Sequence, residues 1–512
     1  MLAFGAALLH AASSLSAAGA PAVKNGGTFR IGHTGDLAFI DSALNSPFNE
    51  TGEIPSLTCL YPLNYADGPS SRLVPDAAAG YRVSRNGKTY TFRIRKGLRF
   101  SSGERVTAQT FVAAVNRTLK VRHYPASLVA DIVGAEGVGN GSAKTASGIR
   151  ARGNRLVVTL NAPSTDFVFR TIGPTFCAVP NGLPIDPEGV PAPIAQAGPY
   201  YVASFVRGRR VILKRNRRYR GRRPHHVDQF VLTYNDDPDT IVSRIERGEL
   251  DTGPVDLDAR LARRYGVNRT QYFVKPTPTV LFMIFNGARP LFKGVAMRRA
   301  VNLAVNRRAL VRAAEPTRGA NWATPVDQWL TPSMPGYRAA RIYPLGGSVG
   351  KARALLRRHR GPERVTLYTR DEDSFVAWAQ LVGRDLKRAG ASVTIKAFPR
   401  SVLGERLASP GEPWDLAFAG GFGPDYPDPA SVIGLFAGAP TPAKYRRLID
   451  RAARLVGAAR YRLYGRLDVE LQRNVAPTVP FASSNTATFV SKRVGCKTFH
   501  PELNLVAVCL KR

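Results

Sequence analysis

Helix-like and strand-like segments alternate through the second half of this 512-residue chain. Apolar residues recur there at helical spacing in two segments and form short strand-like runs in three others. Such alternation predicts an α/β domain in which helices cover a sheet. In chain order, the segments are a helix at 348–360, a strand at 364–370, a helix at 375–390 and strands at 392–398 and 414–421.

Helical periodicity also extends through 290–313 and through 443–475, and each stretch is predicted to form one helix. The first half of the chain is richer in strands. It contains a strand and Gly turn followed by a helix up to Leu119, and a hairpin pattern at 198–219. A chain of 512 residues is longer than one core can fill, so two or three domains are expected.

The chain is strongly basic, with 73 Lys+Arg against 37 Asp+Glu and a formal net charge of +36. Such a field favours anionic surroundings such as nucleic acid, anionic lipid or cell-wall polymers. The arginines are spread along the whole sequence, however. The densest stretch, 207–226, lacks the aromatic platform or zinc-ligand spacing of nucleic-acid modules. Nucleic acid is therefore not an expected partner, and a coding bias toward Arg is the simpler explanation.

Residues 1–22 are apolar and small, and polar residues begin at Lys24. They resemble the apolar and cleavage regions of a secretory signal, with Ala20-Pro21-Ala22 as the cleavage site, although a basic n-region is missing. The segment contains no Cys that could carry a lipid. We expect an exported protein, in the periplasm or at the extracellular face of the cytoplasmic membrane.

The four cysteines fit an oxidising compartment. They form no C-x-x-C pair and have no metal-ligand spacing with His. Bridging Cys496 and Cys509 closes a short loop, worth about 3 kcal/mol in the chain-entropy model. Cys59 and Cys177 are then the remaining pair. Four buried free thiols are the alternative.

Sequence motifs for catalysis or cofactors are absent. The chain has no H-E-x-x-H, no G-x-S-x-G and no Rossmann G-x-G-x-x-G after a strand. The Gly-rich stretch 134–145 lacks the Lys that a phosphate loop requires directly after its last Gly. The sequence therefore predicts no enzyme, no cofactor and no metal site.

The loop "GGFGPDYPDP" at 420–429 follows a buried strand and places Asp425 and Asp428 among Gly and Pro. Two carboxylates in such a stiff loop could cap a helix, bind a metal, act as acid and base, or hold the cation of a ligand. An Asp-Pro pair directly before a helix is a common helix start, which favours capping for Asp428.

Several segments, in order, resemble the solute-binding proteins of bacterial ABC importers, family 5, the peptide, dipeptide and nickel class. They are the strand, Lys-Gly turn and helix within 67–119, the Gly-Pro-Tyr hairpin and Lys-Arg-Asn-x-x-Tyr of 198–219, the Pro-Leu-Phe segment and helix from Pro290, "KARALLRR" at 351–358 and "WDLAFAGGFGPDYPDPASVIGLF" at 414–436. The resemblance covers nearly all of 26–500. Each motif alone is weak, but five in the same order are specific.

The resemblance implies an α/β fold of the periplasmic-binding-protein type (type II, cluster C), with two lobes, an extra inserted domain and a hinge. The implied divisions are 23–64, 185–276 and 481–512 for a discontinuous lobe 1, 65–184 for the inserted domain and 277–480 for lobe 2. The function it implies is capture of a peptide or other small solute and delivery to the transmembrane subunits of an ABC permease. A monomer without nucleic acid is expected.

The family pattern also implies site residues. In peptide-binding members an Asp in this loop pairs with the α-amino group of the ligand, and the matching position here is Asp425, with Tyr426 beside it. A closed cleft excludes water, so a buried ammonium without a carboxylate would cost several kcal/mol. Gly421 and Gly423, with Gly420, would let a ligand backbone reach the strand edge.

Two further side chains are candidates. Phe422 stands where the family often has Trp and could pack on a ligand side chain. Arg370 ends the strand at 364–370 and could meet a ligand carboxylate, although an uninvolved surface Arg is an equal reading. The charge of +36 is unusual for the family. A non-peptide or anionic solute, or a basic cell-surface interaction protein, remain the alternatives.

Overall fold

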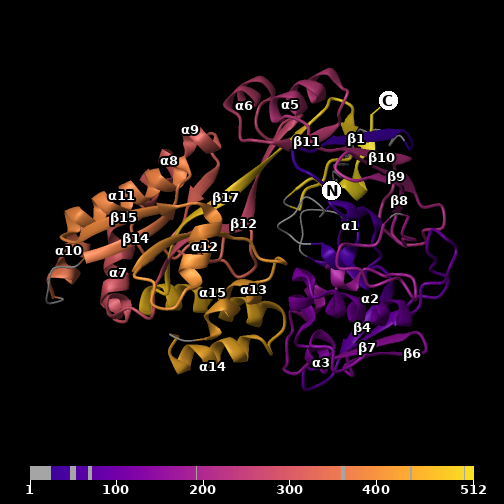
Figure 1. The fold of residues 1–512 in the computed structure, drawn as a ribbon, viewed down its shortest axis with the longest axis horizontal. Helices are drawn as coiled ribbons and strands as arrows, with labels where there is room; N and C mark the ends of the chain where they lie inside the picture. The colour runs from indigo at the N-terminus through magenta and orange to yellow at the C-terminus, as the bar shows by residue number, and fades with distance from the viewer. Residues whose placement is uncertain are drawn as a thin grey trace, which may run out of the picture.

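The structure is a computed structural model, and it describes residues 25–45, 53–66, 72–191, 193–358, 364–438, 441–500 and 502–511. The signal-like segment 1–22 lies outside the described residues. Figure 1 shows two halves side by side, connected by two long strands, β12 and β17. Within the described part of the chain, no helix has both the length and the apolar character needed to cross a membrane.

One mixed sheet runs through both halves. Parallel pairs β14–β15 and β1–β10 lie in opposite halves, and the strands between them are mostly antiparallel. In spatial order the strands are β15 (Ser392–Phe398), β14 (Arg364–Arg370), β16 (Leu416–Phe422), β12 (Tyr272–Phe285), β17 (Thr478–Val490), β11 (Thr252–Val255), β1 (Thr28–Gly32), β10 (Gln229–Thr233), β9 (Arg210–Arg215) and β8 (Tyr200–Val206); β13 (Ala323–Pro325) pairs with β17.

The two connecting strands pair with each other in both halves. Residues 272–276 of β12 pair with 485–489 of β17, and residues 280–284 pair with 478–483. Between Pro276 and Val280 the register shifts, and Thr277 Oγ1 donates to the Ser484 carbonyl at 2.9 Å. The ladder is thus irregular at Pro276–Val280, and again at Leu281–Phe282, and a hinge rotation can be absorbed by the few residues of such an irregularity.

Helices cover the part of the sheet formed by β14, β15 and β16, as the alternating sequence predicts (Figure 1). At the centre of this core lies Trp378, which is fully buried, contacts Phe418 and Phe481, and donates its indole N–H to the Leu310 carbonyl at 2.8 Å. The helices of this half are α7 (Val295–Ala304), α8 (Arg307–Ala313), α9 (Glu315–Arg318), α10 (Val349–Arg358), α11 (Asp373–Ala389), α12 (Arg400–Ala408), α13 (Ala430–Ile433), α14 (Ala443–Ala452) and α15 (Gly457–Asn474).

Two predicted helices are each divided in the structure. The stretch 290–313 forms a 3₁₀ turn followed by α7 and α8, and Asn306 caps α8 by accepting a hydrogen bond from the Ala309 N–H. The stretch 443–475 forms α14 and α15. The second helix begins at Gly457, whose positive φ of 59° interrupts the helical path. The prediction of single helices was therefore wrong.

A separate four-stranded antiparallel sheet lies in the other half. Its inner face packs on α2 (Ala108–Val121), with Tyr90, Phe92, Leu156 and Val158 fully buried. The strand order is β4 (Ala78–Val83), β5 (Thr89–Ile94), β7 (Arg155–Thr159), β6 (Ile149–Arg152). The remaining elements of this half include α1 (Glu53–Thr58), α3 (Ala135–Gly139), α4 (Phe167–Arg170), α5 (Pro238–Arg247), α6 (Ala259–Tyr265) and the short pairs β2 (Leu63–Tyr65) with β3 (Leu73–Pro75) and β18 (Val494–Gly495) with β19 (Cys509–Leu510).

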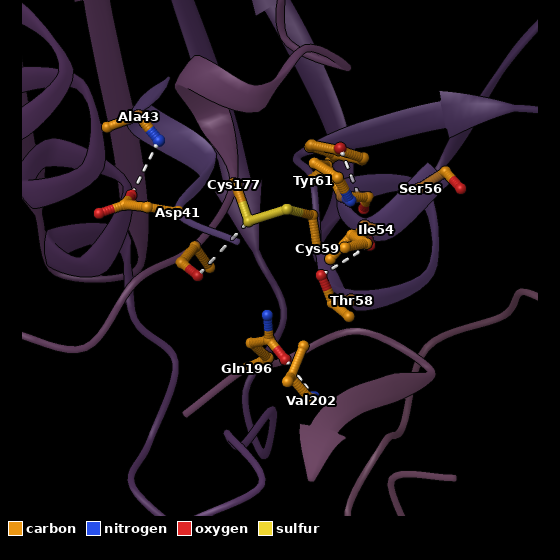
Figure 2. The surroundings of a disulfide bond; sticks show 12 residues. Asp41, Ala43, Ile54, Ser56, Thr58, Cys59, Tyr61, Cys177, Gln196 and Val202 are labelled. Carbon is orange, nitrogen blue, oxygen red and sulfur yellow. Dashed lines mark hydrogen bonds between the residues drawn. A yellow bond between two sulfur atoms is a disulfide. The ribbon is translucent and has the colours of Figure 1, made fainter. Parts of the chain in front are cut away.

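Both predicted disulfide pairs are present, Cys59–Cys177 and Cys496–Cys509. Figure 2 shows that Cys59 directly follows α1, whose C-terminal Thr58 donates to the Ile54 carbonyl at 2.8 Å. The first bond connects positions 118 residues apart and joins the two ends of the segment that contains the four-stranded sheet. It therefore fixes α1 against the end of that segment.

Removing the Cys59–Cys177 bond should destabilise the protein more than removing Cys496–Cys509. Loop-closure entropy predicts a loss of about 4–5 kcal/mol for the long loop and about 3 kcal/mol for the short one. Denaturant unfolding of the two Cys→Ser double variants under non-reducing conditions measures the difference. Equal unfolding midpoints would show that loop length does not govern the effect.

Candidate functional site

A cavity of about 790 Å³ opens between the halves of the molecule. One wall comes from α1, the segment 252–255 of β11, the segment 486–488 of β17 and the C-terminal segment 500–506. The same wall continues through residues 124–128 and 169–174, which belong to the half with the four-stranded sheet, and the opposite wall is the loop after β16 with Asp425 and Tyr426. Segments from distant parts of the sequence therefore build one enclosure, and its volume suits a small ligand.

Asp428 anchors the loop after β16 to α15. This side chain is fully buried and forms a two-point ion pair with Arg460 of α15, with Nη2 at 2.7 Å from Oδ1. It also accepts a hydrogen bond from the Ala430 N–H at 2.8 Å, at the start of α13, so the predicted helix start is confirmed. Burial raises the pKa of Asp428 although Arg460 opposes the shift. Asp428 thus stabilises the loop and has no free face for a ligand.

Asp425, three residues earlier, is exposed on the cavity wall. Its Oδ1 accepts a hydrogen bond from the hydroxyl of Tyr124, which belongs to the opposite wall. Burial, and then the hydrogen bond to this carboxylate, raise the pKa of Tyr124. One oxygen of this exposed carboxylate is therefore engaged by a phenol.

Tyr426 makes a second contact across the cavity. Its hydroxyl donates to Asp166 Oδ2 at 2.6 Å, and its ring stacks on Phe169 with centroids 6.3 Å apart. Burial disfavours ionisation of Asp166, but the Arg170 guanidinium and the hydrogen bonds from Ser164 and Tyr426 hold its pKa below the usual value. The Tyr426 contact is thus a charge-assisted hydrogen bond to a buried carboxylate.

The outer rim of the same interface adds a third contact. The Thr165 N–H donates to the Ala453 carbonyl at 3.0 Å, and its hydroxyl donates to the Leu455 carbonyl at 2.9 Å. Tyr124, Thr165 and Asp166 all precede α4, and their partners all lie between β16 and α15. One side of the cavity is therefore bridged by contacts between two segments that are about 300 positions apart, as for Tyr124 and Asp425.

The other predicted site residues lie outside the cavity wall. Phe422 is half-buried against Trp329, with ring centroids 6.2 Å apart. A Cβ at Gly421 or Gly423 would lie 3.3 Å or 2.9 Å from side-chain atoms of Thr279. These two glycines therefore accommodate Thr279 of the neighbouring strand β12.

Arg370 is also engaged elsewhere. Its guanidinium lies 4.5 Å from the centroid of the Phe375 ring and 3.5 Å from Glu372. A Cβ at Gly420 would come within 2.7 Å of the same guanidinium. In this structure Arg370 packs over the start of α11 and against Gly420, and it does not line the cavity.

Sequence reasoning did not identify the wall opposite Asp425. There His33 Nε2 lies 3.1 Å from Glu53 of α1, and Arg223 donates to the carbonyls of Ser56 and Cys59 at 2.7 Å and 3.0 Å. These residues come from three separate segments and form no local motif. Among the described residues, no group of three or more His, Cys, Asp or Glu could hold a metal ion.

Sequence comparison assigns the family. The sequence model for bacterial extracellular solute-binding proteins, family 5, middle region, matches residues 72–443. The chain belongs to the family 5 extracellular solute-binding proteins. The fold class predicted from the sequence, a two-lobed α/β binding protein with an inserted domain and a hinge, is thereby confirmed.

Curated family members are distant relatives. A probable deoxycholate-binding periplasmic protein of Escherichia coli, YgiS, is 24% identical over 451 residues, which are 82% of this chain and 81% of the relative. The dipeptide-binding protein DppE of Bacillus subtilis is 23% identical, covering 71% of this chain and 68% of the relative. Their names give different ligands, so family membership alone does not fix the ligand.

Solved structures share the whole fold. Clavulanic acid biosynthesis oligopeptide binding protein 2 superposes with a TM-score of 0.84 at 22% identity and covers 96% of this chain and 97% of its own. The unliganded open form of the murein tripeptide binding protein MppA has a TM-score of 0.77 at 16% identity, covering 96% of this chain and 98% of its own. The described chain therefore has the complete two-lobed architecture of this family.

Changing Tyr426 to Phe should weaken the contact across the cavity while keeping the aromatic stack. The buried Asp166 carboxylate would lose one donor, which costs about 1–3 kcal/mol. Small-angle scattering of the unliganded protein should show a larger radius of gyration, and the unfolding midpoint should fall. Tyr201→Phe, on the edge strand β8, is the matched control and should change neither quantity. An unchanged radius in Tyr426→Phe would mean that this bond does not hold the halves together.

Proposed function

We propose that this protein captures a peptide-like solute in the cavity between its lobes and delivers it to the transmembrane subunits of an ABC permease. The observation that carries the proposal is the position of Asp425. It is an exposed carboxylate on the wall of a ligand-sized cavity, in the loop that the family resemblance associates with a ligand α-amino group. Peptide-binding relatives and neighbours support the same class of ligand.

The division of the chain supports capture by lobe closure. We assign 23–64, 185–276 and 481–512 to lobe 1, 65–184 to the inserted domain and 277–480 to lobe 2. One register shift of the β12–β17 ladder falls at Pro276 and Val280, next to the proposed boundary. The bond Cys59–Cys177 connects positions near the two ends of the inserted domain. A rotation at the β12–β17 irregularity would open and close the cavity.

The opposite wall offers a strand edge to an extended ligand. On its β1 side, β11 pairs at Thr252 only, through Ile31, and 253–255 continue along the cavity without a partner among the described strands on that side. An extended peptide can hydrogen-bond to such an edge. The backbone groups of Gly253 and Val255 face Phe489 and Ala487 of β17, because the adjacent Val490 donates its N–H to the Gln271 carbonyl on the other side of β17. Pro254 faces the open side and contributes its carbonyl but no N–H.

A ligand ammonium at Asp425 would replace the hydroxyl of Tyr124. The exchange converts a phenol–carboxylate hydrogen bond into a charged pair, which strengthens the interaction. Release of the ligand returns the carboxylate to Tyr124, so that it is never left without a donor. A ligand must therefore bind the Asp425 carboxylate more strongly than the Tyr124 hydroxyl does.

Export is part of the proposal. Relatives of this chain are named as periplasmic proteins, and the segment 1–22 resembles a secretory signal. The two disulfide bonds agree with an oxidising compartment. We propose a monomer that works outside the cytoplasm.

Peptide capture can be tested by native mass spectrometry after incubation with a tryptic digest of casein, and with the same digest after acetylation of its amino groups. The protein should retain peptides from the first digest and few from the second. Asp425→Asn should reduce retention by tenfold or more, because a charged pair is lost. Asp450→Asn, an exposed carboxylate on α14, is the control and should retain peptides normally. Retention of a single non-peptide mass, independent of Asp425, would contradict the peptide assignment.

Changing Tyr124 to Phe tests whether the Tyr124 hydroxyl competes with the ligand for Asp425 or contributes to ligand binding. If the phenol competes for Asp425, the variant should bind the casein peptides more tightly, by up to about tenfold, since a hydrogen bond to a charged group no longer has to be broken. Calorimetric titration with a peptide recovered from wild-type protein measures the change. Weaker binding would show that the hydroxyl instead contacts the ligand.

A further inference from the structure

The outer face of the four-stranded sheet carries a cluster of arginines that the solute-binding function does not use. Side chains alternate along each strand, and one face packs on α2. The other face presents five exposed arginines, which we call the arginine face: Arg82, Arg93, Arg150, Arg152 and Arg155. In Figure 1 this sheet lies at the opposite end of the molecule from α10 and α11.

The strand register places like charges directly opposite one another. Arg155 of β7 pairs with Arg93 of β5 on one side and with Arg152 of β6 on the other. In the adjacent row, Val157 is flanked by Thr91 and Arg150, and Thr91 pairs with Arg82. Like charges directly opposite on one face of a sheet are destabilising. The free protein thus bears a repulsion that an anionic partner would relieve.

No carboxylate within the sheet offsets this repulsion. The four strands contain neither Asp nor Glu, and none of the five arginines forms an ion pair with a described residue. Buried arginines elsewhere have carboxylate partners in the pairs Arg117–Asp41 and Arg460–Asp428. The arginine face is therefore a local concentration of uncompensated charge within a basic protein.

The composition of the arginine face selects among anionic partners. The positions between the arginines are Thr91, Val157 and the turn residues Gly153 and Asn154. A single-stranded nucleic acid site needs aromatic rings on which bases stack. The centre of a protein interface is depleted of charge and enriched in aromatic residues. A planar surface of anionic headgroups needs only a flat array of cations, and each Arg close to such a surface contributes to binding.

We propose that the arginine face docks the protein on the anionic lipid headgroups of a bilayer. Residues of three adjacent strands would contact headgroups together, and the net charge of +36 would attract the protein to the surface from a distance. The inference rests on strand register and charge and does not depend on which solute occupies the cavity.

The test is co-sedimentation with vesicles of phosphatidylcholine alone and with vesicles of equal parts phosphatidylglycerol and phosphatidylcholine. The protein should bind only the second kind, and binding should fall steeply with added salt. The triple variant Arg93→Gln, Arg152→Gln, Arg155→Gln should bind about a hundredfold more weakly. The control Arg299→Gln, Arg312→Gln, Arg388→Gln removes the same charge from α7, α8 and α11 and should bind nearly as the wild type does.

Several outcomes would overturn the proposal. Equal losses in both triple variants would mean that net charge alone governs binding. Equal binding to both kinds of vesicle would show that the protein does not recognise the charge of the headgroups. Duplex DNA or soluble polyphosphate that displaces the protein from vesicles at equal phosphate concentration would identify a general polyanion site in place of a lipid surface.

A stability measurement checks the premise separately. Arg155→Gln removes the central charge of the row and should raise the melting temperature at low salt while weakening binding to phosphatidylglycerol vesicles. The gain in melting temperature should disappear at high salt, where repulsion between exposed charges is screened. A melting temperature that falls in Arg155→Gln would show that the arginines are not in mutual repulsion, and would remove the argument for an anionic partner.

Discussion

The pairing of β12 with β17 is the constraint on which the rest of this structure depends. The two strands are 206 positions apart at their starts, Tyr272 and Thr478, and every other strand of the long sheet is placed relative to them in one half or the other. Backbone pairing is continuous enough to make one sheet and irregular at Pro276–Val280. The same feature therefore joins the lobes and permits them to move.

The loop after β16 contains two carboxylates, three positions apart, in different environments. Asp428 is buried and held by Arg460 and the Ala430 N–H, which fixes the backbone of the loop. Asp425 can then project into the cavity on a rigid support, where Tyr124 is its partner. A buried charge needs a permanent partner, whereas an exposed one can exchange partners. That difference in burial separates a structural Asp from one suited to a ligand.

The fold was predictable because its signals are local, and most of the cavity was not. Helix and strand alternation, five ordered motifs and the spacing of Cys496 and Cys509 are all visible in sequence. Helical periodicity alone could not reveal the breaks at Asn306 and Gly457, because the apolar stripe continues across both. Phe422 and Gly421 have Trp329 and Thr279 as neighbours through strand pairing and packing, which local sequence does not encode.

The arginines of this chain differ in whether a carboxylate lies beside them. A coding bias accounts for the number of arginines but does not determine which of them form ion pairs. Around the cavity, Arg170 lies against Asp131 and Asp166, and Arg460 is held by Asp428. On the outer face of β5, β6 and β7, three arginines stand side by side without a carboxylate. The arginines beside the cavity are thus neutralised by neighbouring carboxylates, whereas the outer face of the sheet retains a positive field that attracts anions.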